Sequence, residues 1–292
     1  MAELQSFKVY LIPESGEGEY HIKNEPGEEQ RRHLVERGDS VMVQADLVGV
    51  IHGTLSKAQS ASCPSGDPAT LIIIEFRFHP NKNSRRFESA RIKIIFTGKN
   101  ADPEVLRIAP YGKFSLDPAQ KQVELDRAAN ASVQGGALGV SVSVGLKYDL
   151  KQSFTERSEA TLRGVILLER RSQRGQKNAA EWIVEENPNT KRGLPFFLRT
   201  AILLKRKPSS DEESAKFQAT LKIKADVDWK SSVGILRDRL LGRLPEDDPI
   251  NFNPQLPPTI PGLDADNLDK MDLSTLSDVI ATTTLRSPVR DQ

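Results

Sequence analysis

A strict two-residue alternation of apolar and polar side chains constrains this chain more than any other feature. In residues 216–227, Phe217, Leu221 and Ile223 alternate with lysine, glutamine and threonine. Successive side chains of a β-strand point to opposite faces, so this pattern predicts a strand with one buried and one hydrated face. Residues 70–78 and 88–96 repeat the pattern. The turn-rich segment between them predicts that these two strands form an antiparallel hairpin.

Further strand candidates make the chain mainly β. They lie at residues 7–12, 40–51, 105–109, 140–150, 161–170, 181–185 and 196–205. Turn signals separate most of these segments, and helical periodicity is nearly absent among them. About ten short strands with this spacing predict an antiparallel β-sandwich.

The C-terminal quarter of the chain has a different pattern. Residues 229–244 place apolar side chains at helical spacing and predict an amphipathic helix that closes the sandwich domain, residues 1–244. Six prolines in residues 245–262 predict an extended linker, because proline interrupts both helices and central strands. Residues 263–292 are acidic and contain a short helical pattern. We therefore expect a Pro-rich, disordered tail that tethers a short helix.

The segment 181–207 predicts two strands, paired with each other and joined by a specified turn. Trp182 lies in the first strand, and its large ring is expected to anchor the core. Asn187, Pro188 and Gly193 have the composition of a tight connector. Trp229 marks the junction between the last strand and the helix, and we expect it to pack the helix down. These five residues are candidate structural anchors.

The same segment carries a family resemblance. Trp182, the Glu186-Asn187-Pro188 run, Lys191, Gly193 and Pro195 follow a WxxxENPxxKxGxP pattern, and Leu203–Arg206 read LLKR. In these residues the chain resembles a group of uncharacterised proteins of filamentous fungi, and the likeness extends over about residues 70–207. The resemblance implies a fungal source and a β-rich domain. It implies no activity and no functional residue.

Charge and composition narrow the partners and the location. The net charge is +1, but residues 243–292 hold nine acidic and four basic side chains, which leaves a mildly basic body. This balance falls short of a nucleic-acid-binding footprint, so a nucleic-acid partner is not expected. The N-terminus has no basic region followed by a long apolar run, and Cys63 is the only cysteine. We therefore expect a cytoplasmic protein, and a nuclear location is kept as an alternative.

No pattern in the chain predicts a catalytic, cofactor or metal site. The four histidines (His21, His33, His52 and His79) lack the short-range spacing of zinc ligands. Phosphate-binding glycine loops and the GxSxG nucleophile turn are also missing from the sequence. The sequence therefore favours a non-enzymatic protein, and a hydrolase with an unrecognised site is kept as an alternative.

The most unusual composition lies in residues 132–165. Val140, Val142, Val144, Leu146, Tyr148 and Leu150 alternate with small or polar residues. A hairpin that enters a membrane has this pattern, because one face meets lipid and the other meets water. A soluble sandwich hairpin has the same pattern. The sequence favours a protein-interaction module that engages a protein partner through its loops or C-terminal tail. A membrane-active or pore-forming protein that uses residues 132–165 is the alternative, and the oligomeric state is open.

Overall fold

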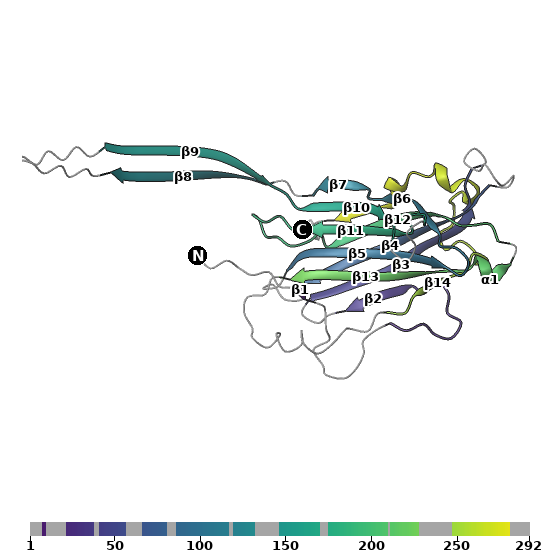
Figure 1. Ribbon diagram of the computed structural model, residues 1–292. Helices are drawn as coiled ribbons and strands as arrows, with labels where there is room; N and C mark the ends of the chain where they lie inside the picture. Colours follow the sequence, from purple (N-terminus) through teal and green to yellow (C-terminus); the bar gives the residue numbers. More distant parts are fainter. Residues whose placement is uncertain are drawn as a thin grey trace, which may run out of the picture.

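The computed structural model describes residues 8–9, 22–37, 41–56, 66–80, 86–116, 119–131, 146–169, 175–209, 211–227 and 247–280. These residues form two large antiparallel sheets and a separate two-stranded ribbon (Figure 1). The helical elements among them are short: α1 (Glu212–Ala215) and the 3-10 helices η2 (Ala265–Lys270) and η3 (Leu273–Leu276). The prediction of a mainly β, antiparallel chain is confirmed.

One sheet, here called the front sheet, is built around β5. Its strands lie in the order β1 (Lys8–Val9), β13 (Phe217–Val227), β5 (Phe87–Gly98), β11 (Ala179–Glu185), β10 (Thr161–Leu167) and β7 (Gly112–Ser115). A short strand, β14 (Ile250–Phe252), also pairs with β13. The alternation that predicted a strand at residues 216–227 thus becomes β13.

The other sheet, here called the back sheet, is built around β4. Its order is β15 (Asp278–Ile280), β12 (Phe197–Lys205), β4 (Pro68–Pro80), β3 (Val41–Thr54) and β2 (His33–Arg37), and β6 (Glu104–Ala109) pairs with β12. All pairings in both sheets are antiparallel.

The main core lies between the two sheets. Ile72, Ile74 and Phe76 of β4 belong to the same buried cluster as Ile92 and Ile94 of β5. The rings of Phe78 and Phe87 meet edge to face across the sheets, with centroids 5.6 Å apart. Each alternating strand therefore contributes one full face to a shared apolar interior, which removes that face from water.

Two predicted strand pairs are corrected by the observed register. β4 pairs with β3 and β12, whereas β5 pairs with β11 and β13, so the expected hairpin of these two strands is wrong. β11 and β12 likewise lie in different sheets. In both cases the connector passes from one sheet to the other. Alternation determines which face of a strand is buried, but it does not determine the neighbour of the strand.

Residues 247–280, here called the strap, differ from the predicted linker and tethered helix. Ile250 and Phe252 are buried in the main core, and Leu268 and Leu273 are buried against the outer face of the back sheet. Thr259 donates its backbone N–H to the Val50 carbonyl at 3.0 Å. A proline-rich segment cannot continue a central strand, but it can lie extended across a sheet and bury its apolar side chains there.

The start of the strap is also joined to the segment that precedes β2. The buried Arg31 donates from Nη2 to the Asp248 carbonyl at 2.9 Å, and Asn24 Nδ2 donates to the Pro249 carbonyl at 2.8 Å. The strap therefore connects both sheets with the N-terminal part of the body. Trp229 and the helix predicted at residues 229–244 lie outside the described residues, as do residues 281–292 of the predicted tail.

Candidate functional site

The third sheet is a long ribbon that extends away from both large sheets (Figure 1). It consists of β8 (Ala119–Ala131) and β9 (Leu146–Ser158), each of 13 residues. Strands of this length span about 43 Å at a rise of about 3.3 Å per residue. Within the described residues, neither strand pairs with a strand other than its partner.

The position of this ribbon corrects the hairpin predicted at residues 132–165. β10 belongs to the front sheet, and the partner of β9 is β8, which the sequence did not single out. Residues 119–131 read as a polar segment, since seven of the 13 residues are polar or charged and four of the six apolar ones are alanine. Apolar and polar residues alternate around Val123 and Leu125, and this strand could have been predicted from that alternation.

The register divides the ribbon into two chemically different faces. Directly opposite residues of an antiparallel ribbon share a face, and successive pairs alternate between the two faces. One face receives the pairs Val123–Phe154, Ala129–Tyr148 and Ala131–Leu146. The other face receives the pairs Asp126–Lys151, Ala128–Asp149 and Asn130–Lys147. The outer part of the ribbon, from the Ala129–Tyr148 pair onward, is therefore amphipathic.

Three charged residues fall on the apolar face. Lys121 and Glu156 lie near the body, and Arg127 lies farther along the ribbon. From the Ala129–Tyr148 pair outward, the described pairs place no charged residue on this face. In the sequence the same parity continues through Val144, Val142 and Val140. The apolar alternation from Val140 to Leu150 covers 11 residues, close to the roughly 9–11 residues with which a tilted strand crosses a bilayer.

The ribbon leaves the front sheet between its last two strands. β7 leads into β8, and β9 leads into β10, whose first residue, Thr161, is opposite Ser115 of β7 and Glu185 of β11. Ser89 of β5 is opposite Glu185, so the first residues of β5 lie at this same end of the sheet. We call it the ribbon end of the body.

The connector between β11 and β12 also lies at the ribbon end. Asn187 is buried, and its Oδ1 accepts from the backbone N–H groups of Asn189 at 2.9 Å and Thr190 at 3.2 Å. Glu186 accepts from Arg86 Nε and from the Gly193 N–H, both at 3.0 Å. Gly193 has φ of 84°, a value that favours glycine. Pro188 is exposed on the outer side of the turn.

Trp182 lies at the centre of the front sheet with its side chain fully buried. Its Nε1 donates to the Pro110 carbonyl at 2.9 Å, which satisfies the indole N–H. This contact requires glycine opposite Trp182, because a Cβ at Gly164 would stand 2.0 Å from the Pro110 oxygen. The structure thus brings Trp182 and the Asn187–Gly193 turn into the packing of the body.

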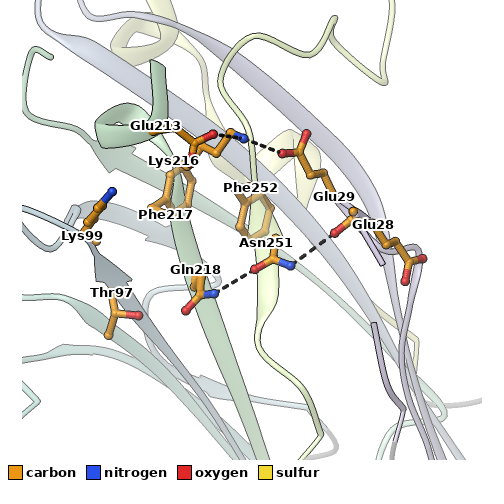
Figure 2. Close-up of a pocket in the computed structure, with 12 residues that line it drawn as sticks. Glu28, Glu29, Thr97, Lys99, Glu213, Lys216, Phe217, Gln218, Asn251 and Phe252 are labelled. Atoms are coloured by element: carbon orange, nitrogen blue, oxygen red, sulfur yellow. Dashed lines mark hydrogen bonds and ion pairs between the residues drawn. The ribbon is translucent and has the colours of Figure 1, made fainter. Parts of the chain in front are cut away.

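A cleft of about 500 Å³ lies at the opposite end of the front sheet, where Phe217 of β13 is paired with Gly98 of β5. Figure 2 shows Phe217 and Phe252 side by side in it, and their rings are stacked at 4.8 Å. Lys216 reaches Glu213 at 2.6 Å and Glu29 at 3.2 Å. These ion pairs join α1 to the N-terminal part of the body, so the polar groups of the cleft mainly bind one another.

His52 is a buried histidine in β3. Gln30 Nε2 donates to its Nε2 at 2.7 Å, and its Nδ1 lies 3.0 Å from the Thr70 hydroxyl. Burial, and then the charge of Arg206, lower the pKa of His52 from 6.5 to about 4. The neutral ring is therefore the folded form, because a proton on Nε2 would meet the amide donor of Gln30.

This histidine predicts acid-sensitive stability. Between its ordinary pKa of 6.5 and its folded pKa of about 4, the unfolded chain binds a proton that the folded chain cannot bind. The contribution of His52 to the free energy of unfolding is therefore fully present above its ordinary pKa. As the pH falls through this window, the contribution decreases by about 1.4 kcal/mol per pH unit. Urea unfolding at pH 7.5 and pH 5 should differ by about 2 kcal/mol from His52 alone. His52→Gln should remove this difference, whereas His33→Gln, at a 76% exposed side chain, should keep it.

The histidines do not form a metal site in the described part of the chain. His33, His52 and His79 each contact different partners: Asp46, Thr70 and Gln44. Among the described residues, no group of three or more His, Cys, Asp or Glu side chains could hold a metal ion. In the same residues, no helix has the length and apolar character needed to cross a bilayer.

Comparison with known proteins gives no family. No family model matches the chain, and no curated protein matches its sequence. Among solved structures, the Clostridium perfringens NetB toxin in its membrane-inserted form aligns over 66% of this chain and 82% of the toxin, with 8% identity and a TM-score of 0.26. A structure described as a pore forming protein covers 66% of this chain and 79% of its own, with 8% identity and a TM-score of 0.29.

The Clostridium perfringens delta-toxin aligns over 75% of this chain and 92% of its own length, with 10% identity and a TM-score of 0.27. These TM-scores lie well below the level at which two chains share a fold. The likenesses therefore carry no argument for the fold or the function of this chain.

Proposed function

We propose that the protein is a membrane-active β protein that inserts the ribbon β8–β9 into a lipid bilayer. The observation that carries the proposal is the ribbon itself: two 13-residue strands extend from the body, and their register separates an apolar from a polar face. The interaction module and the hydrolase remain alternatives to it.

The ribbon has the properties expected of a hairpin that inserts into a bilayer. A two-stranded ribbon alone is marginally stable in water, because it buries little apolar surface and leaves two edges unpaired. Insertion beside the ribbons of other copies removes both causes of this instability, the exposed apolar surface and the unpaired edges. The edges pair with neighbouring strands, the apolar face meets lipid, and the polar face lines a water-filled interior. Asp126, Lys151, Asp149 and Lys147 fall on that polar face.

The remaining charges on the apolar face are compatible with this orientation. Lys121 and Glu156 are opposite each other near the body, and Arg127 lies four residues from the described end of β8. If the apolar run from Val140 to Leu150 crosses the bilayer, Arg127, opposite Leu150, falls at its interface on the side of the body. Arginine near the interface costs far less than at the midplane, about 0–1 kcal/mol.

Single cysteines carrying an environment-sensitive dye test the proposal at four successive positions. In a Cys63→Ser background, dyes at residues 129 and 131 should report an apolar environment when phospholipid vesicles are added. Dyes at residues 128 and 130 should report water throughout, because they belong to the opposite face. If all four positions stay water-like with vesicles present, the membrane proposal fails, and the ribbon is left as a surface for a protein partner.

A further inference from the structure

A row of basic side chains crosses the outer face of the front sheet. In register from β13 to β7, the row reads Lys224, Arg91, Ile183, Arg163 and Lys113. The four basic residues of the row, here called the stripe, are all exposed, and the side chains of Arg91 and Lys113 are 56% and 64% exposed. The stripe therefore spans five neighbouring strands, a width of about 19 Å at 4.8 Å per strand.

The stripe concentrates like charge at a cost to the isolated protein. Lys224 is directly opposite Arg91, and in the next row Lys222 is directly opposite Lys93. Directly opposite like charges destabilise a sheet. Arg91 lies 3.6 Å from Glu181, and Lys113 lies 3.3 Å from Glu159, which offsets part of this cost. Within the described residues, Arg163 and Lys224 make no ion pair.

Acidic groups border the stripe on the side of the ribbon. The row nearer the ribbon contains Asp226 and Glu185, and Asp226 accepts from the Ser89 hydroxyl. On the other side of the stripe, Lys93 is paired with Glu169, and Lys222 adds a further basic residue. The positive surface therefore ends toward the ribbon and continues away from it.

The opposite side of the same molecule presents an acidic segment that contains η2 and η3. The strap covers the outer face of the back sheet, where Leu268 and Leu273 are buried against Leu71 and Leu203. Residues 261–280 contain five aspartates and one lysine. The exposed aspartates among them are Asp264, Asp266, Asp272 and Asp278.

We propose that the stripe of one copy binds the strap of a second copy of this chain. The two surfaces lie on opposite outer sides of the body, so the contact is heterologous, and each copy offers one free stripe and one free strap to further copies. The inference rests on the proposed function, since this contact is the one that brings ribbons of neighbouring copies side by side.

The contact suits a closed ring. β8 and β9 continue from the strand ends of the front sheet, so copies stacked front to back extend their ribbons in the same direction (Figure 1). Each ribbon adds two strands, about 10 Å of circumference. Each body is thicker, since two packed sheets are separated by about 10 Å and the strap adds a further layer. In one ring, the thicker bodies therefore fit the larger outer circumference, and the ribbons fit the smaller inner circumference.

Charge reversal with mixing tests the contact. One variant carries Arg163→Glu and Lys224→Glu, and a second carries Asp266→Lys and Asp278→Lys. Each alone should form at least about tenfold less cross-linked oligomer on vesicles than the unmodified chain, because like charges then meet at every contact. An equimolar mixture should recover assembly, since alternating copies restore opposite charges at both kinds of contact. The variant that carries all four substitutions should also recover it.

Two controls separate a lost contact from a lost fold. Lys207→Glu reverses an exposed charge that belongs to neither the stripe nor the strap and should assemble like the unmodified chain. Urea unfolding of both double variants should stay within about 1 kcal/mol of the unmodified chain, as is usual for surface substitutions.

The outcomes distinguish this inference from the membrane proposal. Oligomers that form equally well in either double variant, or a mixture that fails to recover, would overturn the stripe–strap contact. Vesicle leakage that persists in both double variants would overturn it too, while leaving the membrane function intact. Assembly that follows the charge rule without any leakage would support the contact and count against the membrane function.

Discussion

Replacing Ala131 by arginine is expected to reduce dye release from vesicles at least about tenfold, because an arginine that faces the bilayer midplane costs about 2–4 kcal/mol per strand. Ala131 is opposite Leu146 on the apolar face of the ribbon, near the middle of the apolar run from Val140 to Leu150. Each copy in an assembly carries the same substitution, so the cost recurs at every ribbon.

Ala128 supplies a matched control for Ala131. Ala128 has the same side chain, in the same strand, but is opposite Asp149 on the polar face. Ala128→Arg should therefore keep dye release within about threefold of the unmodified chain, since charged residues are tolerated in a polar lumen. Equal losses in both variants would show that the two faces of the ribbon are not used differently, which would contradict insertion.

Replacing Phe252 by alanine is expected to cost about 3–5 kcal/mol of unfolding free energy, a large share of the stability of a domain. The ring of Phe252 is 1% exposed and stacks on Phe217, within the main core. Its removal leaves a cavity at the point where the strap joins the front sheet. Urea unfolding followed by tryptophan fluorescence measures the loss.

Gln255→Ala is the control within the same segment, because Gln255 is exposed. It should change the unfolding free energy by less than about 0.5 kcal/mol. A loss below about 1 kcal/mol for Phe252→Ala would mean that the strap does not pack on the body in solution. In that case the tethered tail predicted from the prolines would be the better description.

Alternation predicted the strands of the body better than their partners. β13, β4 and β5 follow from their period-two pattern, because burial of one face requires it. The partners differ from expectation since a turn-rich connector of several residues can return within a sheet or cross to the facing sheet. The Asn187–Gly193 connector crosses, held by the hydrogen bonds of Glu186 and Asn187, and no local pattern distinguishes the two routes.

The ribbon and the strap show what local patterns missed. The apolar alternation around Leu146 and Tyr148 was visible, but the polar strand β8 became recognisable only through its register with β9. Ile250 and Phe252 stand among prolines and acidic residues, which individually favour an extended linker. Their burial depends on an apolar surface supplied by strands about 30 residues or more away in the chain, and composition carries no record of such long-range contacts.

Insertion of the ribbon is tested by the release of a small dye from phospholipid vesicles when the unmodified chain is added. We expect release that rises steeply with protein concentration, because several ribbons must assemble before water can pass. A variant in which a short Gly-Asn-Gly turn replaces residues 122–155 should stay folded and release no dye. Absence of release at every concentration, or equal release by the variant without its ribbon, would show that the ribbon does not open the bilayer.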